Sequence, residues 1–86
     1  MRVKLITGVT GDQMVANAYL RRVRVAGTAN LVGAVQIKQG ATVLETIPAA
    51  STPGTERWWE DTSFDNTGPL TINMANAGDS VLVFFG

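Results

Sequence analysis

The stretch Ser80-Val81-Leu82-Val83-Phe84-Phe85-Gly86 decides the fold class, because a run of β-branched and aromatic residues follows a polar turn sequence, Asn76-Ala77-Gly78-Asp79. Such a run predicts a β-strand that is buried on both faces, or buried on one face and covered by a partner on the other. Residues this apolar are unstable when fully exposed to water. We therefore expect the strand over residues 81–85 to be an integral part of the domain.

Upstream of this strand, alternating apolar positions are interrupted by Gly, Asn or Pro about every 8 to 12 residues, which is typical of a β-sandwich or barrel. The expected strands cover residues 2–7, 19–25, 31–38, 41–47, 57–64, 70–74 and 81–85. Residues 14–20 are the one place where a short helical turn competes with an extended strand. The pattern predicts an all-β, single-domain protein over residues 1–86, a small antiparallel β-sandwich of jelly-roll-like form with about seven strands and no substantial helix.

Turn-forming residues separate these strands. Turns are expected over residues 8–13, at Gln39-Gly40 and over residues 65–69, and residues 47–54 form a surface loop because they contain two prolines. Proline cannot donate a hydrogen bond to a strand ladder, and glycine permits a positive φ angle. The Gln39-Gly40 turn predicts a hairpin between the strands on either side of it.

Composition indicates a protein that needs partners. A chain of 86 residues buries only about 60 to 65% of the surface that its unfolded form exposes. The sequence has no Cys and no His, which removes disulfides and the usual zinc ligands as stabilising devices. Only 16% of residues are charged, below the roughly 25% of soluble domains. We therefore expect a homo-oligomer or attachment to another protein.

The net charge of zero argues against a general nucleic-acid or membrane-surface binder, but it conceals an asymmetry. Residues 1–38 carry six cationic side chains and one acidic one, a net +5, and residues 39–86 carry the reverse, a net −5. Two interpretations stay open. The halves could form a basic and an acidic face that attract partners, or their strands could interleave and mix the charges.

No stretch approaches the roughly 20 apolar residues that span a bilayer. The segment Met1-Arg2-Val3-Lys4-Leu5-Ile6 is a faint match to a signal peptide, but Gly8, Thr10 and Asp12 interrupt the apolar region that such a peptide needs. We expect an unprocessed protein that is made in a cytosol.

Catalysis and metal binding find little support in the sequence. Without His or Cys, acid–base chemistry would fall to carboxylates, Lys4, Lys38 or Tyr19. Glu60-Asp61 is the only adjacent acidic pair, and neighbours on a strand point to opposite faces. We expect no enzyme activity, no cofactor and no metal. The oxygen ligands of a conceivable calcium site have the spacing of ordinary turns; they are Asp61, Asp65, Asn66, Asn76 and Asp79.

Three segments are candidates for a partner interface. Trp58-Trp59 puts one indole on each face of a strand, so one ring could enter the core while the other anchors a partner or stacks on a sugar. Arg21-Arg22-Val23-Arg24 places Arg22 and Arg24 side by side, as a fork for carboxylates or as a solvated strand face. Phe84-Phe85 offers a packing surface or a strand-pairing edge.

A resemblance adds a functional expectation to these patterns. The quoted motifs are Arg22-Val23-Arg24-Val25-Ala26-Gly27-Thr28, Val35-Gln36-Ile37-Lys38-Gln39-Gly40 leading into Val43-Leu44-Glu45, Gly68-Pro69-Leu70-Thr71-Ile72, and Asp79-Ser80-Val81-Leu82-Val83-Phe84. In this order, residues 20–85 resemble small virion structural proteins of tailed bacteriophages. The likeness is one of strands and turns and carries over no functional residue.

The resemblance implies assembly rather than catalysis. It implies a capsid cement or decoration protein that binds the major capsid protein or another virion protein and is located in the virion. A tail, spike or fibre component is the alternative within the same class. A small carbohydrate-binding module is the alternative from another class, and it would need an exposed aromatic platform.

Overall fold

The computed structural model describes residues 2–14, 20–58 and 70–85, which form eight β-strands. The strands are β1 (Arg2–Thr7), β2 (Gly11–Met14), β3 (Leu20–Val25), β4 (Val35–Gln39), β5 (Thr42–Ile47), β6 (Glu56–Trp58), β7 (Leu70–Met74) and β8 (Ser80–Phe85). No helix occurs in these three described ranges. The predicted all-β sandwich is confirmed, with eight strands instead of about seven.

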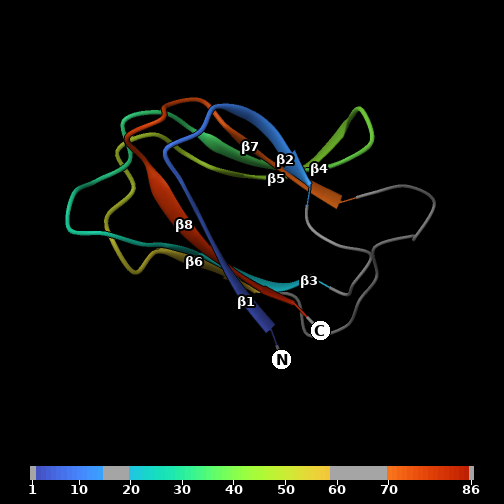
Figure 1. Ribbon diagram of the computed structural model, residues 1–86, viewed down its shortest axis with the longest axis horizontal. Coiled ribbons are helices and arrows are strands. Elements are labelled where there is room, and N and C mark those ends of the chain that lie inside the picture. The colour runs from blue at the N-terminus through green and yellow to red at the C-terminus, as the bar shows by residue number, and fades with distance from the viewer. Residues whose placement is uncertain (1, 15–19, 59–69, 86) are drawn as a thin grey trace.

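The strands form two antiparallel sheets whose orders are β1-β8-β3-β6 and β2-β7-β4-β5 (Figure 1). In both sheets the hydrogen-bonded neighbours include strand pairs whose numbers add up to nine: β1 with β8, β3 with β6, β2 with β7, and β4 with β5. Eight strands arranged this way in two sheets are the jelly roll. The jelly-roll-like arrangement expected from the sequence is therefore present.

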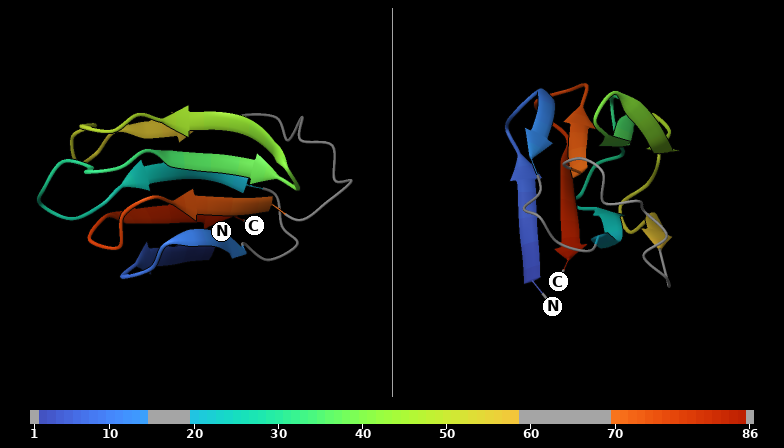
Figure 2. Two further views of the ribbon diagram at one scale, coloured as in Figure 1. Left: turned by 90° about the horizontal axis from the view of Figure 1, so that it is seen from above. Right: turned by 90° about the vertical axis from the view of Figure 1, so that its right-hand side faces the viewer.

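The two sheets are stacked, and each strand of one sheet lies over a strand of the other (Figure 2). The side chains between the sheets form one apolar core because they alternate along the strands: positions 70, 72 and 74 of β7 and positions 81, 83 and 85 of β8 are buried. The core consists of Ile6, Val23, Val25, Leu31, Val35, Ile37, Ile47, Leu70, Ile72, Met74, Val81, Val83 and Phe85.

Strand β8 lies inside its sheet and not at an edge. It pairs with β1 on one side and with β3 on the other, so the sequence-based expectation of a strand-pairing edge at Phe84-Phe85 is wrong. The partners of β8 come from the first third of the chain, and its own sequence holds no signal for them. The strand is buried on one face and half-buried on the other, so it is integral to the domain as expected, and cover of its outer face by a partner stays a prediction.

Two expected boundaries differ from the structure. Residues 8–13 were expected to be a turn, but β2 begins at Gly11 because its backbone pairs with β7. Gly8 and Gly11 keep the positive φ angles of a turn, 71° and 83°. The strand expected from residue 31 begins at Val35, because the backbone of Leu31 is bonded to the loop before β6: its N–H donates to Ser51 O and its carbonyl accepts from Ala50 N–H.

A buried carboxylate fixes the turn between β7 and β8 against the segment before β4. The two carboxylate oxygens of Asp79 accept hydrogen bonds from the backbone N–H groups of Val32 and Gly33, both at 2.9 Å. Gly33 lies so close to Ala75 that a Cβ atom there would be 2.8 Å from the Ala75 Cβ. Asp79 therefore ties together one end of the sandwich, where the chain crosses between the sheets.

Candidate protein-interaction face

The outer surface of the sheet β1-β8-β3-β6 carries an exposed apolar cluster. Because Val81, Val83 and Phe85 point into the core, Leu82 and Phe84 point outward. In the β1–β8 ladder, Val3 lies opposite Phe84 and Leu5 opposite Leu82. Val3 is 53% exposed and Leu5 is 54% exposed. We call this surface the β8 face and define it by Val3, Leu5, Leu82, Phe84, Arg22, Arg24 and Glu56.

The arginines of the β8 face lie beside this apolar cluster. Arg22 pairs with Phe84 and Arg24 with Leu82 in the β3–β8 ladder, so the expectation that the two arginines share one strand face is confirmed. The Arg22 guanidinium lies 4.0 Å from the centroid of the Phe84 ring, a cation–π contact. Glu56 of β6 is the acidic partner of both arginines: its Oε1 is 3.6 Å from Arg22 Nη1 and 3.7 Å from Arg24 Nε.

The other sequence-predicted interface residues lie elsewhere. Arg21 is exposed and lies at a β-bulge, where the β3–β8 register shifts between Leu20 and Arg22. Phe85 is only 7% exposed and belongs to the core, with Arg2 5.1 Å above its ring. This burial removes Phe85 from the interface set, because its position in β8 has the same parity as Val81 and Val83.

The interface role of the two tryptophans remains a prediction. Trp58 lies opposite Arg22 in the β3–β6 ladder, and its side chain lies outside the described part of the structure. Trp59, residues 59–64 of the expected strand and the turn expected over residues 65–69 also lie outside it. The same holds for Tyr19 and for the rest of residues 15–19, the segment where a helical turn was expected to compete with a strand.

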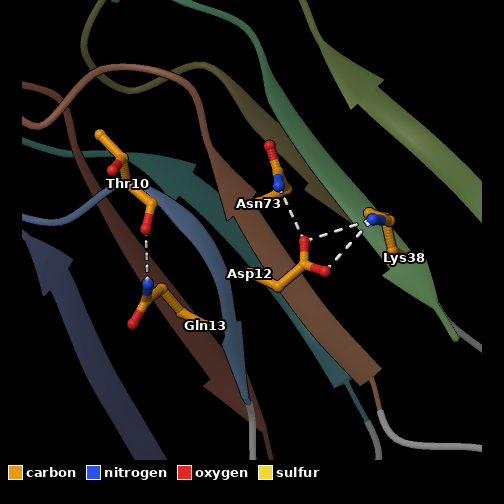
Figure 3. Close-up of polar contacts among 5 residues, drawn as sticks. All are labelled: Thr10, Asp12, Gln13, Lys38 and Asn73. Atoms are coloured by element: carbon orange, nitrogen blue, oxygen red, sulfur yellow. Dashed lines mark hydrogen bonds and ion pairs between the residues drawn. The ribbon is translucent and has the colours of Figure 1, made fainter. Parts of the chain in front are cut away.

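The outer surface of the sheet β2-β7-β4-β5 is mainly polar, although it also carries the exposed side chain of Val43 opposite Lys38. We call it the β7 face and define it by Asp12, Lys38, Asn73, Gln36 and Thr46. Figure 3 shows Asp12 of the edge strand β2, whose carboxylate accepts a hydrogen bond of 2.7 Å from Asn73 Nδ2 and contacts Lys38 Nζ at 3.3 Å. The hydrogen bond from Asn73 lowers the pKa of Asp12 below its ordinary value, and Lys38 lowers it further. These polar groups satisfy one another within the chain.

The acidic and basic halves of the sequence interleave. Each sheet contains strands from both halves, and Arg22 and Arg24 of the first half form ion pairs with Glu56 of the second half. Arg57 Nε lies 3.3 Å from Glu45 Oε1 and joins β6 to β5, the strands at one edge of the two sheets. The structure therefore contradicts a separation into one basic and one acidic face.

Sequence reasoning missed four residues of the β8 face: Val3, Leu5, Leu82 and Glu56. Val3 and Leu5 alternate with Lys4 in β1, and this signal was available in the sequence. Glu56 had no local signal, because its contact with the arginines depends on the pairing of β3 with a strand far along the chain.

Chemistry of other kinds is not apparent in the described residues. Within residues 2–14, 20–58 and 70–85, no three acidic side chains cluster in a way that could hold a metal ion. The same ranges contain no helix long and apolar enough to cross a membrane. Comparison of the chain with protein-family models, with curated proteins and with solved structures found no match.

Proposed function

We propose that this chain is a non-enzymatic structural protein of a bacteriophage particle, a cement or decoration subunit that binds the assembled head through the β8 face. The observation that carries the binding role is the exposed cluster of Val3 and Leu5 beside Phe84 and two arginines. Aromatic, aliphatic and arginine side chains in one patch are typical of protein interfaces. The assignment to a phage particle rests on the resemblance of residues 20–85.

A subunit that binds a shell in many copies can stabilise it even when each copy binds weakly. Copies that bind only the assembled shell favour that form, because each occupied site adds its own binding free energy.

The test is to locate the chain in purified particles. Particles from the virus that encodes the chain are separated into heads and tails, and the amount of this chain per particle is measured by quantitative mass spectrometry. We expect a high copy number in the head fraction and a lower temperature of genome release when the chain is missing. A chain found only in tails would replace the cement role by the tail or fibre role. Its absence from purified particles would reject the proposal.

A further inference from the structure

We propose that the β8 face recognises a carboxylate on its protein partner through Arg24, while Leu5, Leu82 and Phe84 pack against apolar side chains around that carboxylate. This inference rests on the proposed function, since it specifies the chemistry of the surface that the β8 face binds. Its parts are the two arginines, their shared acid Glu56 and the apolar cluster next to them.

The two arginines are held differently. The Arg22 side chain is 23% exposed and its guanidinium lies over the Phe84 ring, so it is part of the packing of the sheet surface. The Arg24 side chain is 47% exposed, and its Nε is 3.7 Å from Glu56 Oε1, which is longer than a hydrogen bond. A guanidinium in this state can bind a carboxylate with two parallel hydrogen bonds. Arg24 is therefore the residue that meets the partner.

The charge of the β8 face favours an acidic group on the partner. Arg22 and Arg24 together carry +2 and Glu56 carries −1, which leaves +1 on the residues that define the face. A partner that covers the face removes water from these groups, and a covered charge without a counter-charge is costly. One carboxylate on the partner balances the face, and its position opposite Arg24 fixes the orientation of the complex.

A second copy of this chain fits the β8 face poorly. Two copies could pack face to face with β1 and β8 of one copy over β1 and β8 of the other. In that arrangement the β3 strands, which carry Arg22 and Arg24, also lie over each other, and like charges come together.

Strand pairing between copies at β1 is unfavourable for a similar reason. In the antiparallel register that puts Val3 opposite Leu5 of another copy, Lys4 lies opposite Lys4. Lysine on an edge strand is a common device against such pairing. We therefore assign the β8 face to a different protein.

The test compares charge-matched variants on the two outer faces. Particles depleted of the chain, with and without nuclease treatment, are mixed with purified protein and sedimented, and the bound amount is measured against concentration. We expect Arg24→Gln to weaken binding about tenfold or more, because it removes a charged partner at a covered contact. Arg24→Lys keeps the charge without the fork and should weaken binding less. Lys38→Gln, with the same charge change on the β7 face, should leave binding unchanged.

The outcomes separate the inference from the proposed function. If wild-type protein does not bind depleted particles, the proposed function fails. If wild-type protein binds and Arg24→Gln binds equally well while keeping its melting temperature, the function stands and the inference is overturned. Two further results would also overturn it: loss of wild-type binding after nuclease treatment, and a wild-type dimer in sedimentation equilibrium that Leu5→Lys dissociates.

Discussion

The β8 face and the β7 face cover the same core and yet present different chemistry. On the β7 face, the carboxylate of Asp12 is bound within the chain by Asn73 and Lys38. On the β8 face, Val3 and Leu5 stay half exposed beside arginines that share one acid. Inward-facing positions are apolar in both sheets. The comparison teaches that both sheets need apolar residues at the inward positions, whereas the outward positions differ between the two faces.

The strongest way to break this comparison is to remove the strand beneath the β8 face. Deleting residues 82–86 takes away most of β8, which pairs with both β1 and β3 and contributes Val83 and Phe85 to the core. We expect an insoluble or unfolded product, measured by circular dichroism and thermal melting. The control is the full-length double variant Leu82→Thr, Phe84→Thr, which keeps the inward residues and should still melt cooperatively. A soluble truncated protein with a cooperative transition would contradict the expectation.

The next largest effect concerns the turn that holds the two sheets together. Asp79→Ala removes the acceptor of two hydrogen bonds from backbone amides, those of Val32 and Gly33. Hydrogen bonds to a charged group contribute about 1.5 to 3 kcal/mol each, so we expect a loss of about 3 kcal/mol or more in the free energy of unfolding. Asp79→Asn keeps one acceptor oxygen and should lose about half as much. Urea unfolding measures both, and equal stability of Asp79→Ala and wild type would show that Asp79 is dispensable.

Matched lysine substitutions sharpen the comparison without changing the core. Leu5→Lys lies on the β8 face and Thr46→Lys on the β7 face, and both positions are exposed. We expect each to change the free energy of unfolding by no more than about 0.5 kcal/mol. Leu5→Lys should raise the ammonium sulfate concentration needed for precipitation more than Thr46→Lys does, because it interrupts an exposed apolar patch. Equal shifts for the two variants would mean that the β8 face does not promote self-association more than the β7 face does.

The smallest effect is a titration on the β7 face. The pKa of Asp12 lies below 3.8, chiefly because Asn73 donates a hydrogen bond to its carboxylate. The stabilisation from a lowered pKa is complete above the ordinary value and is lost as the pH falls through the folded-state pKa, so it disappears below pH 3.8. Asn73→Ala should raise the pKa toward 3.8, and by more than Lys38→Met does. NMR titration of the Asp12 carboxyl carbon measures this, and a larger rise for Lys38→Met would reverse the order of causes.

The sequence predicted what depends on local alternation. It predicted β8, β7 and the β4–β5 hairpin, because their apolar positions alternate or flank a glycine turn, and it placed Arg22 and Arg24 on one face by the same rule. Features that depend on pairing between strands far apart in the sequence were not predictable. Strand β2 begins with a glycine followed by an aspartate, which locally favour a turn, and only its ladder with β7 makes it extended. The contact of Glu56 with the arginines and the inner position of β8 also depend on pairing between segments far apart in the chain.

The nested pairing of the strands also sets an order in time. Among the strands described, only β4 and β5 are both consecutive in the sequence and hydrogen-bonded to each other. Closing a long loop costs more chain entropy than closing a short one, so contacts between distant segments are slow to form. Once the β4–β5 hairpin exists, β3 can reach β6, β2 can then reach β7, and β1 reaches β8 last. We expect φ-values to be highest in β4–β5 and lowest in β1. The apolar part of the β8 face that β1 and β8 form is therefore completed at the end of folding. A partly folded chain does not yet have this binding surface.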